Sequence, residues 1–217
     1  MFEYQGLKIS WLGHDSFKIK DGKTIIIDPF KIRLSTDKAD ILLVTHEHFD
    51  HLSLDDVKKV ISEKTTIVAI PSCKSDLSKL KVREIKTVRP GDKVSVEDVT
   101  IEAVPAYNLN KFREPGKVFH PKEDGKVGYM ITVKGVKVYH AGDTDAIPEM
   151  KGLRTDLALL PVSGTYVMTA EEAAEATKMI RPKLAIPMHY GAIVGSEQDA
   201  EKFKQLATCQ VQILKPE

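Results

Sequence analysis

The sequence predicts an α+β fold in which two β-sheets pack together and helices cover their outer faces. Strand-like segments dominate the first part of each half of the chain, and helical segments are interleaved later in each half. Two packed sheets with helices outside would bury the apolar surface of both kinds of element. The 217 residues are enough to bury a sizeable core, and no low-complexity segment or linker divides them, so residues 1–217 are expected to form a single domain.

The first half of the chain alternates short apolar runs with turn signals. Asp21-Gly22 is typical of a hairpin turn, and Ser53 is placed as the N-cap of a helix that reaches about residue 62. A second, short helix is expected at 72–80. The predicted strands of this half cover residues 7–12, 17–20, 24–28, 41–44, 66–70, 84–88, 93–96 and 99–104.

The second half repeats this organisation with stronger helix signals. Thr169 and Glu172 form a capping box that opens an alanine-rich helix to Ile180, and Ser196 starts the last helix. The stretch 108–126 is rich in Lys, Arg, Pro and Gly and is predicted to be a long loop, either a functional lid or a solvated surface loop. The predicted strands of this half cover residues 128–133, 136–140, 157–161, 184–187 and 211–214.

The most informative segment is Thr-His-Glu-His-Phe-Asp-His at residues 45–51, directly after an apolar strand-like run. Imidazole nitrogens and carboxylate oxygens are the ligands that suit Zn²⁺ and related divalent ions. In an extended or turning segment His46 and His48 point to the same side, whereas Asp50 and His51 follow after the chain bends. One pair could hold a first ion and the next pair a second, about 3.5–4 Å away, with a shared water between them. The alternative, a histidine-rich surface loop, is disfavoured because further candidate ligands follow other strand-like stretches.

This motif resembles the signature of the metallo-β-lactamase superfamily, and two later segments extend the resemblance. The family carries an aspartate after a glycine near a strand end, here Gly142-Asp143, and a final histidine at another strand end, here His189. The resemblance implies a four-layer αββα sandwich and a metal-dependent hydrolase. Residues 11–17 and 27–30 resemble the branch that includes ascorbate-6-phosphate lactonase and the N-acyl-phosphatidylethanolamine phospholipase D-like proteins.

One position departs from the family pattern. The family's third histidine on the first metal usually follows the strand that here ends near residue 104, but the residue at that position is Asn108. A histidine appears twelve residues later, at His120. Three arrangements remain open: His120 folds back and completes the site, Asn108 binds weakly through its amide oxygen, or the first site lacks one protein ligand. His120 is the favoured choice, because an ion held by two histidines and one shared aspartate would be poorly satisfied.

The resemblance implies a centre of two divalent ions, for which this donor set suits Zn²⁺ and also accepts Mn²⁺ or Fe²⁺. The first ion would be held by His46, His48 and His120. The second ion would be held by Asp50, His51 and His189, with Asp143 as a bridge between the two ions. A metal-bound hydroxide would be the nucleophile, and Asp50 would orient it and pass a proton to the leaving group.

Other polar residues have both functional and structural readings. His14 is a candidate substrate contact, although it equally fits a turn histidine bonded to backbone, and Asn108 is the other candidate contact. Asp28 fits a residue that supports the ligand histidines from behind, and His140 is read as supporting or structural. Four cationic residues of the long loop could attract an anionic substrate: Lys111, Arg113, Lys117 and Lys122.

Composition narrows the classes of partner. The net charge of +1 gives no sign of a nucleic-acid-binding surface, and no apolar run is long enough to cross a membrane. The first residues do not resemble a signal peptide, and the only cysteines, Cys73 and Cys209, are far apart, so a cytoplasmic protein is expected. The leading hypothesis is hydrolysis of a small, anionic ester, lactone or phosphodiester. The alternatives are a nuclease and a non-catalytic metal-binding scaffold, and homo-oligomer formation is left open.

Overall fold

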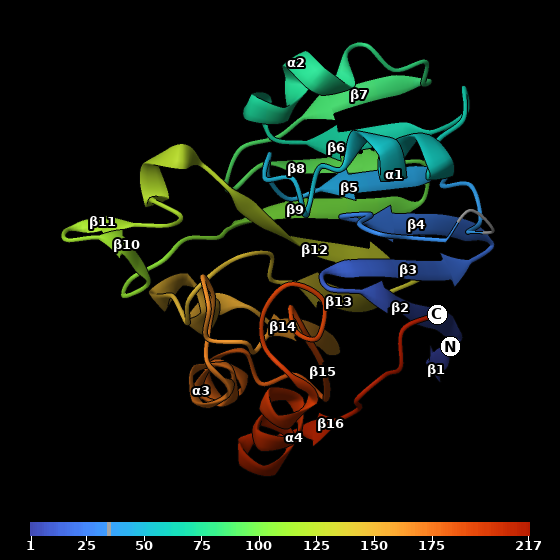
Figure 1. Cartoon of the computed structure of the whole chain (residues 1–217). Coiled ribbons are helices and arrows are strands. Elements are labelled where there is room, and N and C mark those ends of the chain that lie inside the picture. Colours follow the sequence, from blue (N-terminus) through green and yellow to red (C-terminus); the bar gives the residue numbers. More distant parts are fainter. Residues whose placement is uncertain (34–35) are drawn as a thin grey trace. The chain divides into compact units, whose positions relative to one another are not determined.

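The computed structural model describes residues 1–33 and 36–217 of the chain (Figure 1). Two compact units make up the described part. The N-terminal unit contains Met1–Arg89 together with Leu214–Glu217, and the C-terminal unit contains Pro90–Ile213. Each unit carries one seven-stranded mixed sheet. The prediction of a single domain over residues 1–217 stays a prediction.

The sheet of the N-terminal unit has its strands in sequence order. Strands β1 to β4 pair antiparallel, and β4 to β7 pair parallel. The strands are β1 (Phe2–Tyr4), β2 (Leu7–Gly13), β3 (Ser16–Asp21), β4 (Lys23–Ile27), β5 (Ile41–Val44), β6 (Thr66–Ala69) and β7 (Glu84–Thr87). Helix α1 (Leu54–Val60) begins after Ser53, whose side chain accepts a hydrogen bond from the backbone N–H of Asp56, as the predicted N-cap requires.

The sheet of the C-terminal unit changes from antiparallel to parallel at β13. Its order is β16-β15-β14-β13-β12-β9-β8. The strands are β8 (Lys93–Val96), β9 (Val99–Pro105), β12 (Val127–Val133), β13 (Val136–His140), β14 (Leu157–Pro161), β15 (Leu184–Met188) and β16 (Gln210–Val211). Helix α3 (Ala170–Ile180) starts with the predicted capping box and packs against both β14 and helix α4 (Glu197–Leu206), which contacts β15.

Three local predictions differ from the structure in their bounds or their content. The helix expected at 72–80 is a 3₁₀ turn (η1, Pro71–Cys73) followed by one helical turn (α2, Lys74–Leu77). The strand expected at 211–214 is β16, which ends at Val211. The loop expected at 108–126 contains a hairpin of β10 (Phe112–Glu114) and β11 (Lys117–Val118), and the 3₁₀ turn η2 (Lys122–Asp124) (Figure 1). Gly116, at φ +77°, forms the hairpin turn after Pro115, but the exposed strands lack the apolar alternation that marks a strand in sequence.

The candidate ligands follow strands that are buried on both faces. Every residue of β5 and β15 is buried, and these strands are continuous apolar runs, as parallel strands covered on both sides require. Such strands have no room for polar groups along their length, so the polar residues lie where the strands end. No helix in the described part of the chain has both the length and the apolar character needed to span a membrane.

Candidate metal centre

In the N-terminal unit, the segment after β5 turns back on itself and brings its histidines together. The backbone N–H groups of His51 and Leu52 both donate to the carbonyl oxygen of His48. This turn leaves Nε2 of His46 3.1 Å from Nδ1 of His48. The rings of His46 and His51 lie with centroids 4.0 Å apart, and both residues are buried. The motif therefore presents its imidazoles as one group, in which His46 and His51 are buried and His48 is partly exposed.

Asp28, at the end of β4, supports this group from behind. Its carboxylate accepts hydrogen bonds from the backbone N–H of Thr45 at 2.8 Å and from the Thr45 hydroxyl at 2.5 Å. The same carboxylate lies 2.7 Å from Nδ1 of His51, and the Thr45 hydroxyl lies 3.0 Å from Nδ1 of His46. Because Nδ1 of His51 donates to a carboxylate, its Nε2 is the nitrogen that presents a lone pair. These contacts place Asp28 behind His51, where it was expected to support the ligand histidines.

The turn between β2 and β3 places two further residues of the N-terminal unit, His14 and Asp15, near Asp50 and His51. His14, expected to line a substrate pocket, is buried, and its Nε2 lies 3.1 Å from Oδ2 of Asp50. Asp15, which follows it, is also buried and places Oδ2 3.5 Å from Nε2 of His51. Asp15 was not among the predicted site residues. The available signal was the adjacent His-Asp pair in a turn after an apolar strand, which is unusual for a solvated turn.

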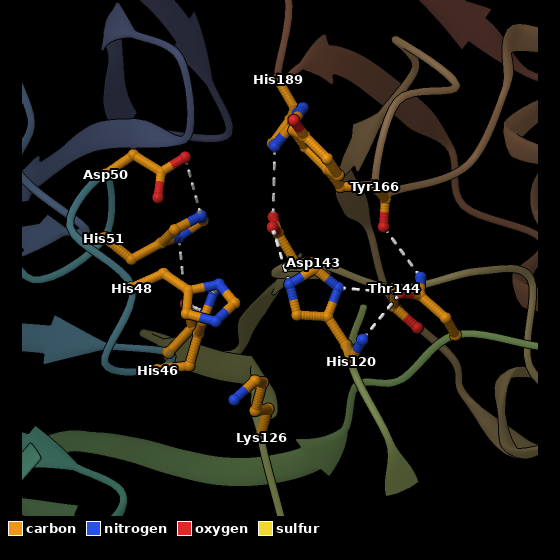
Figure 2. Close-up of polar contacts among 12 residues, drawn as sticks. His46, His48, Asp50, His51, His120, Lys126, Asp143, Thr144, Tyr166 and His189 are labelled. Carbon is orange, nitrogen blue, oxygen red and sulfur yellow. Dashed lines mark hydrogen bonds and ion pairs between the residues drawn. The ribbon is translucent and has the colours of Figure 1, made fainter. Parts of the chain in front are cut away.

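In the C-terminal unit, Asp143 lies between two imidazoles, as Figure 2 shows. One carboxylate oxygen is 3.5 Å from Nε2 of His189, and the other is 3.4 Å from Nε2 of His120. All three residues are buried. The structure thus brings three of the predicted ligands together within one unit, and it gives each oxygen of Asp143 a different histidine.

Asn108, the residue that departs from the family pattern, holds His120. Its amide oxygen accepts hydrogen bonds from the backbone N–H and from ring Nδ1 of His120, both at 2.9 Å. Its amide nitrogen donates to the carbonyl oxygen of Tyr166 at 2.8 Å. The Nδ1 proton of His120 is therefore directed at Asn108, and Nε2 is the ring nitrogen that faces Asp143. Asn108 was expected to contact substrate, but in the structure its side-chain amide is occupied by these internal partners.

Two local features of the backbone position the candidate ligands His189 and Asp143. His189 follows β15 with φ +58°, and its Nδ1 lies 3.0 Å from the Ser163 hydroxyl. On the other side, β12 approaches the end of β13 so closely that a Cβ on Gly128 would lie 2.5 Å from the carbonyl oxygens of His140 and Ala141. His140 accepts a hydrogen bond from the backbone N–H of Gly142 through Nδ1. His140 thus orders the turn that leads to Asp143, which fits its expected structural role.

The cationic residues of the 108–126 segment are largely engaged in ion pairs. Lys111 lies 3.1 Å from Asp145 and 2.7 Å from Glu172, which ties the segment to the start of α3. Lys122 pairs with Glu149 at 2.7 Å, and Glu149 also accepts a hydrogen bond from the hydroxyl of Tyr107. Burial first, and then the hydrogen bond to Glu149, raises the pKa of Tyr107. Lys111 therefore holds the segment through its ion pairs, and the expected attraction of an anionic substrate stays a prediction.

The donor sets of both units fit divalent metal ions. Two ligands bound at about 2.0–2.2 Å from one ion lie about 3.0–3.5 Å apart. The separations are 3.1 Å for His46 to His48, 3.5 Å for His51 to Asp15, and 3.4 and 3.5 Å for Asp143 to its two histidines. Distances of this size separate two ligand atoms that bind the same metal ion. The supporting contacts to Nδ1 of His46, His51, His120 and His189 leave Nε2 as the ligand atom of each ring.

Comparison with known proteins assigns the family. A sequence profile of the beta-lactamase superfamily domain matches residues 8–189. The UPF0173 metal-dependent hydrolase of Methanopyrus kandleri is 36% identical over 211 residues, which are 92% of this chain and 90% of that protein. This chain belongs to the UPF0173 metal-dependent hydrolase family of the metallo-β-lactamase superfamily. A UPF0173 metal-dependent hydrolase of Koribacter versatilis is 32% identical and covers 99% of this chain and 97% of its own length.

Solved structures confirm the predicted metallo-β-lactamase fold. A candidate metal-dependent hydrolase of Parabacteroides distasonis, 36% identical, has a TM-score of 0.84 and covers 96% of this chain and 94% of its own. Igni18, a metallo hydrolase of Ignicoccus hospitalis, has a TM-score of 0.77 at 26% identity and covers 97% of this chain and 95% of its own. As a member of the UPF0173 family, this chain is a metal-dependent hydrolase.

Proposed function

We propose that this UPF0173 hydrolase uses two divalent metal ions to cleave a small, anionic ester, lactone or phosphodiester. The observation that carries the proposal is the position of Asp143, whose two carboxylate oxygens lie 3.4 and 3.5 Å from Nε2 atoms of two different histidines. A carboxylate that serves two ligand groups in this way suits a bridge between two ions. When bound, such a pair of ions lowers the pKa of a shared water and polarises the oxygen of the scissile group.

The ligand assignment follows the family motif and the contacts within each unit. We assign His46, His48 and His120 to the first ion, and Asp50, His51 and His189 to the second, with Asp143 shared. Asn108 is assigned to the support of His120, because its amide oxygen already accepts two hydrogen bonds from that residue. Zn²⁺ suits the imidazole-rich first set, and Mn²⁺ and Fe²⁺ are also compatible with these donors.

Asp50 is the residue proposed to move the proton. Its side chain is 13% exposed, whereas its neighbours His14 and His51 are fully buried, so Asp50 can exchange a proton with a bound substrate. His14 donates toward Oδ2 of Asp50 from 3.1 Å and holds the carboxylate in place. His14 is therefore proposed to orient Asp50, and contact with substrate is a secondary role for it.

Two finer assignments are also proposed. Residues 11–17 and 27–30 support a place near the lactonase and phospholipase D-like branch, since these segments supply His14 and Asp28 to the ligand group. A small-molecule substrate is proposed from the near-neutral charge of the chain, and a cytoplasmic location is proposed from its two cysteines, which are far apart in sequence.

The test combines metal counting with a panel of substrates. Protein stripped with a chelator is reloaded with Zn²⁺ or Mn²⁺, its metal content is measured by mass spectrometry, and turnover is assayed with lactones, nitrophenyl esters and bis-p-nitrophenyl phosphate. The variant Asp143→Asn should lose metal and turnover together. The matched control is Asp98→Asn, which alters an exposed aspartate of the same unit.

Each outcome of this test is decisive. Two metal equivalents with turnover on one probe class support the proposal and name the substrate class. Two equivalents without turnover on any probe favour the metal-binding scaffold. Equal metal content and turnover in Asp143→Asn and Asp98→Asn would refute the binuclear centre.

A further inference from the structure

We propose that Asp15 is an additional ligand of the second metal ion and gives this ion a carboxylate-rich donor set that the motif at 45–51 does not contain. The inference rests on the proposed binuclear function. Asp15, Asp50 and His51 all belong to the N-terminal unit, and Oδ2 of Asp15 lies 3.5 Å from Nε2 of His51. Oδ2 of Asp50 lies 4.0 Å from the same nitrogen.

The turn that carries Asp15 is held firmly at both ends. Gly13 adopts φ +108°, a conformation that favours glycine, and the indole N–H of Trp11 donates to the carbonyl oxygen of His14 at 2.8 Å. After the turn, the hydroxyl of Ser16 donates to the carbonyl oxygen of Asp28 and accepts from the backbone N–H of Phe30. Asp15 is fully buried as a result, unlike an ordinary turn aspartate. A buried, fixed carboxylate beside a ligand histidine is what a metal site requires.

The orientation of the His51 ring shows where an ion would lie next to Asp15. Nδ1 of His51 lies 2.7 Å from the carboxylate of Asp28 and donates its proton there. Nε2 is then the ring nitrogen that faces the carboxylate oxygens of Asp15 and Asp50. Imidazole nitrogen and carboxylate oxygens that converge in this way are the ligand atoms that a divalent ion takes. A divalent ion satisfies all three groups at once.

The charge of the buried group leads to the same conclusion. Asp15, Asp28 and Asp50 place three carboxylates around His51, and the first two are fully buried while Asp50 is 13% exposed. Several carboxylates grouped around one imidazole form a donor set that suits a divalent ion. The rival explanation is a doubly protonated His51 that donates to Asp15, in which case Asp15 only positions the ring. The two explanations differ in whether Asp15 affects metal binding directly.

A carboxylate-rich second site has a consequence for metal selectivity. Carboxylate oxygens suit Mn²⁺ and Fe²⁺, whereas imidazole-rich sets suit Zn²⁺. The first ion, assigned to three histidines and the shared Asp143, should therefore be the Zn²⁺-preferring one. The second ion, with Asp15 and Asp50 added to His51, should tolerate Mn²⁺ better than the first. The two positions are expected to fill with different metals when both are offered.

The first experiment measures the metal affinity of the intact chain. Metal-free wild type, Asp15→Asn and Asp55→Asn are titrated calorimetrically with Mn²⁺ and with Zn²⁺. Asp55 is the matched control, because it is an aspartate of the same unit with a 94% exposed side chain. Loss of a contact that merely supports a ligand lowers metal affinity about 10–100-fold, so loss of a ligand should weaken the second equivalent by at least about 100-fold. The first equivalent and the control should be unchanged.

The second experiment tests contact directly and does not depend on activity. Asp15→Cys and Asp55→Cys are loaded with Co²⁺, and the near-ultraviolet thiolate-to-Co²⁺ charge-transfer band is recorded. The band is expected for Asp15→Cys alone, because only residue 15 reaches the ion, and circular dichroism verifies that each variant is folded. If Asp15→Asn does not fold, this spectrum still decides the inference.

The outcomes separate this inference from the proposed function. A wild type that binds two equivalents, with Asp15→Asn equal to Asp55→Asn and no band in Asp15→Cys, would overturn the role of Asp15 and leave the binuclear hydrolase intact. A wild type that binds fewer than two equivalents would refute the binuclear function itself, and the role of Asp15 would fall with it.

Discussion

Replacing Asn108 with leucine is expected to destabilise the protein and weaken its first metal site. Leucine has the same branching and the same number of side-chain heavy atoms as asparagine, so the change removes the hydrogen bonds while keeping the outline of the side chain, although leucine is larger. Asn108 is buried, and its amide oxygen accepts from both the backbone N–H and ring Nδ1 of His120, each at 2.9 Å. Both donors belong to a buried residue, so water cannot readily replace the lost oxygen.

The magnitude follows from these two donors. A buried donor left without a partner costs about 1–3 kcal/mol, so two of them cost about 2–6 kcal/mol of unfolding free energy. The carbonyl oxygen of Tyr166 also loses the Asn108 amide, but Tyr166 is exposed and its carbonyl can bind water, so we assign it no cost. Free rotation of the His120 ring should in addition weaken metal binding about 10–100-fold.

The assay is urea unfolding of the metal-free chain, followed by metal titration of each variant. Asn108→Asp restores an acceptor for His120 and should recover metal affinity better than Asn108→Leu does. The control Asn110→Ala removes an exposed amide that contacts Glu172 and should leave the affinity unchanged. If Asn108→Leu unfolds at the same urea concentration as Asn110→Ala and binds metal as tightly, the argument that Asn108 fixes His120 is refuted.

Three further predictions concern residues away from the ligands. Gly128→Ala should lower the unfolding free energy by about 1–3 kcal/mol or more, since the new Cβ would lie 2.5 Å from two backbone oxygens. The control is Gly152→Ala, whose Cβ would have no atom within 4 Å, and equal urea midpoints for the two variants would contradict the prediction. Tyr139→Phe should be neutral or stabilise by about 1 kcal/mol, because the buried hydroxyl has no hydrogen-bond partner among the described residues; a clear loss in the same assay would show a partner. Burial alone would raise the pKa of Asp56, but its hydrogen bonds, above all the one from Lys59, together lower this pKa. A carboxyl group with a lowered pKa stabilises the folded protein at pH values above its pKa in the unfolded chain, near 4, and this stabilisation is lost as the pH falls through its pKa in the folded protein. The loss of unfolding free energy caused by Asp56→Asn should therefore shrink below about pH 4. An equal loss at pH 7 and at pH 3 would contradict this prediction.

Local signals predicted the elements whose stabilising contacts are close in sequence. The N-cap at Ser53 and the capping box at Thr169 each depend on a hydrogen bond to a residue three positions away, so the pattern alone located both helix starts. The hairpin of β10 and β11 was missed because its strands are short and exposed, and no apolar alternation distinguishes them from a loop. A Pro-Gly turn was visible there but is common in loops as well.

The separation in sequence also decided which parts of the candidate site could be predicted. The motif at 45–51 was readable because its donors are separated by one or two positions and follow a buried strand. The choice between Asn108 and His120 could not be made from spacing, since the contact that relates them spans twelve positions and depends on how the intervening hairpin folds. Asp15 could not be predicted for a similar reason. His51 lies far from it in sequence, and only folding brings Oδ2 of Asp15 to 3.5 Å from Nε2 of His51.

The sequence by itself determined the superfamily, the strand ends at which the candidate ligands lie, and the kind of chemistry, because ligand types and strand patterns are local properties of the chain. Only the tertiary structure decided which nitrogen of each histidine is presented, that Asn108 supports His120, and that Asp15 joins Asp50 around His51. These features depend on hydrogen bonds between residues distant in sequence, and the backbone path that creates such contacts is fixed only when the sheets of each unit have formed.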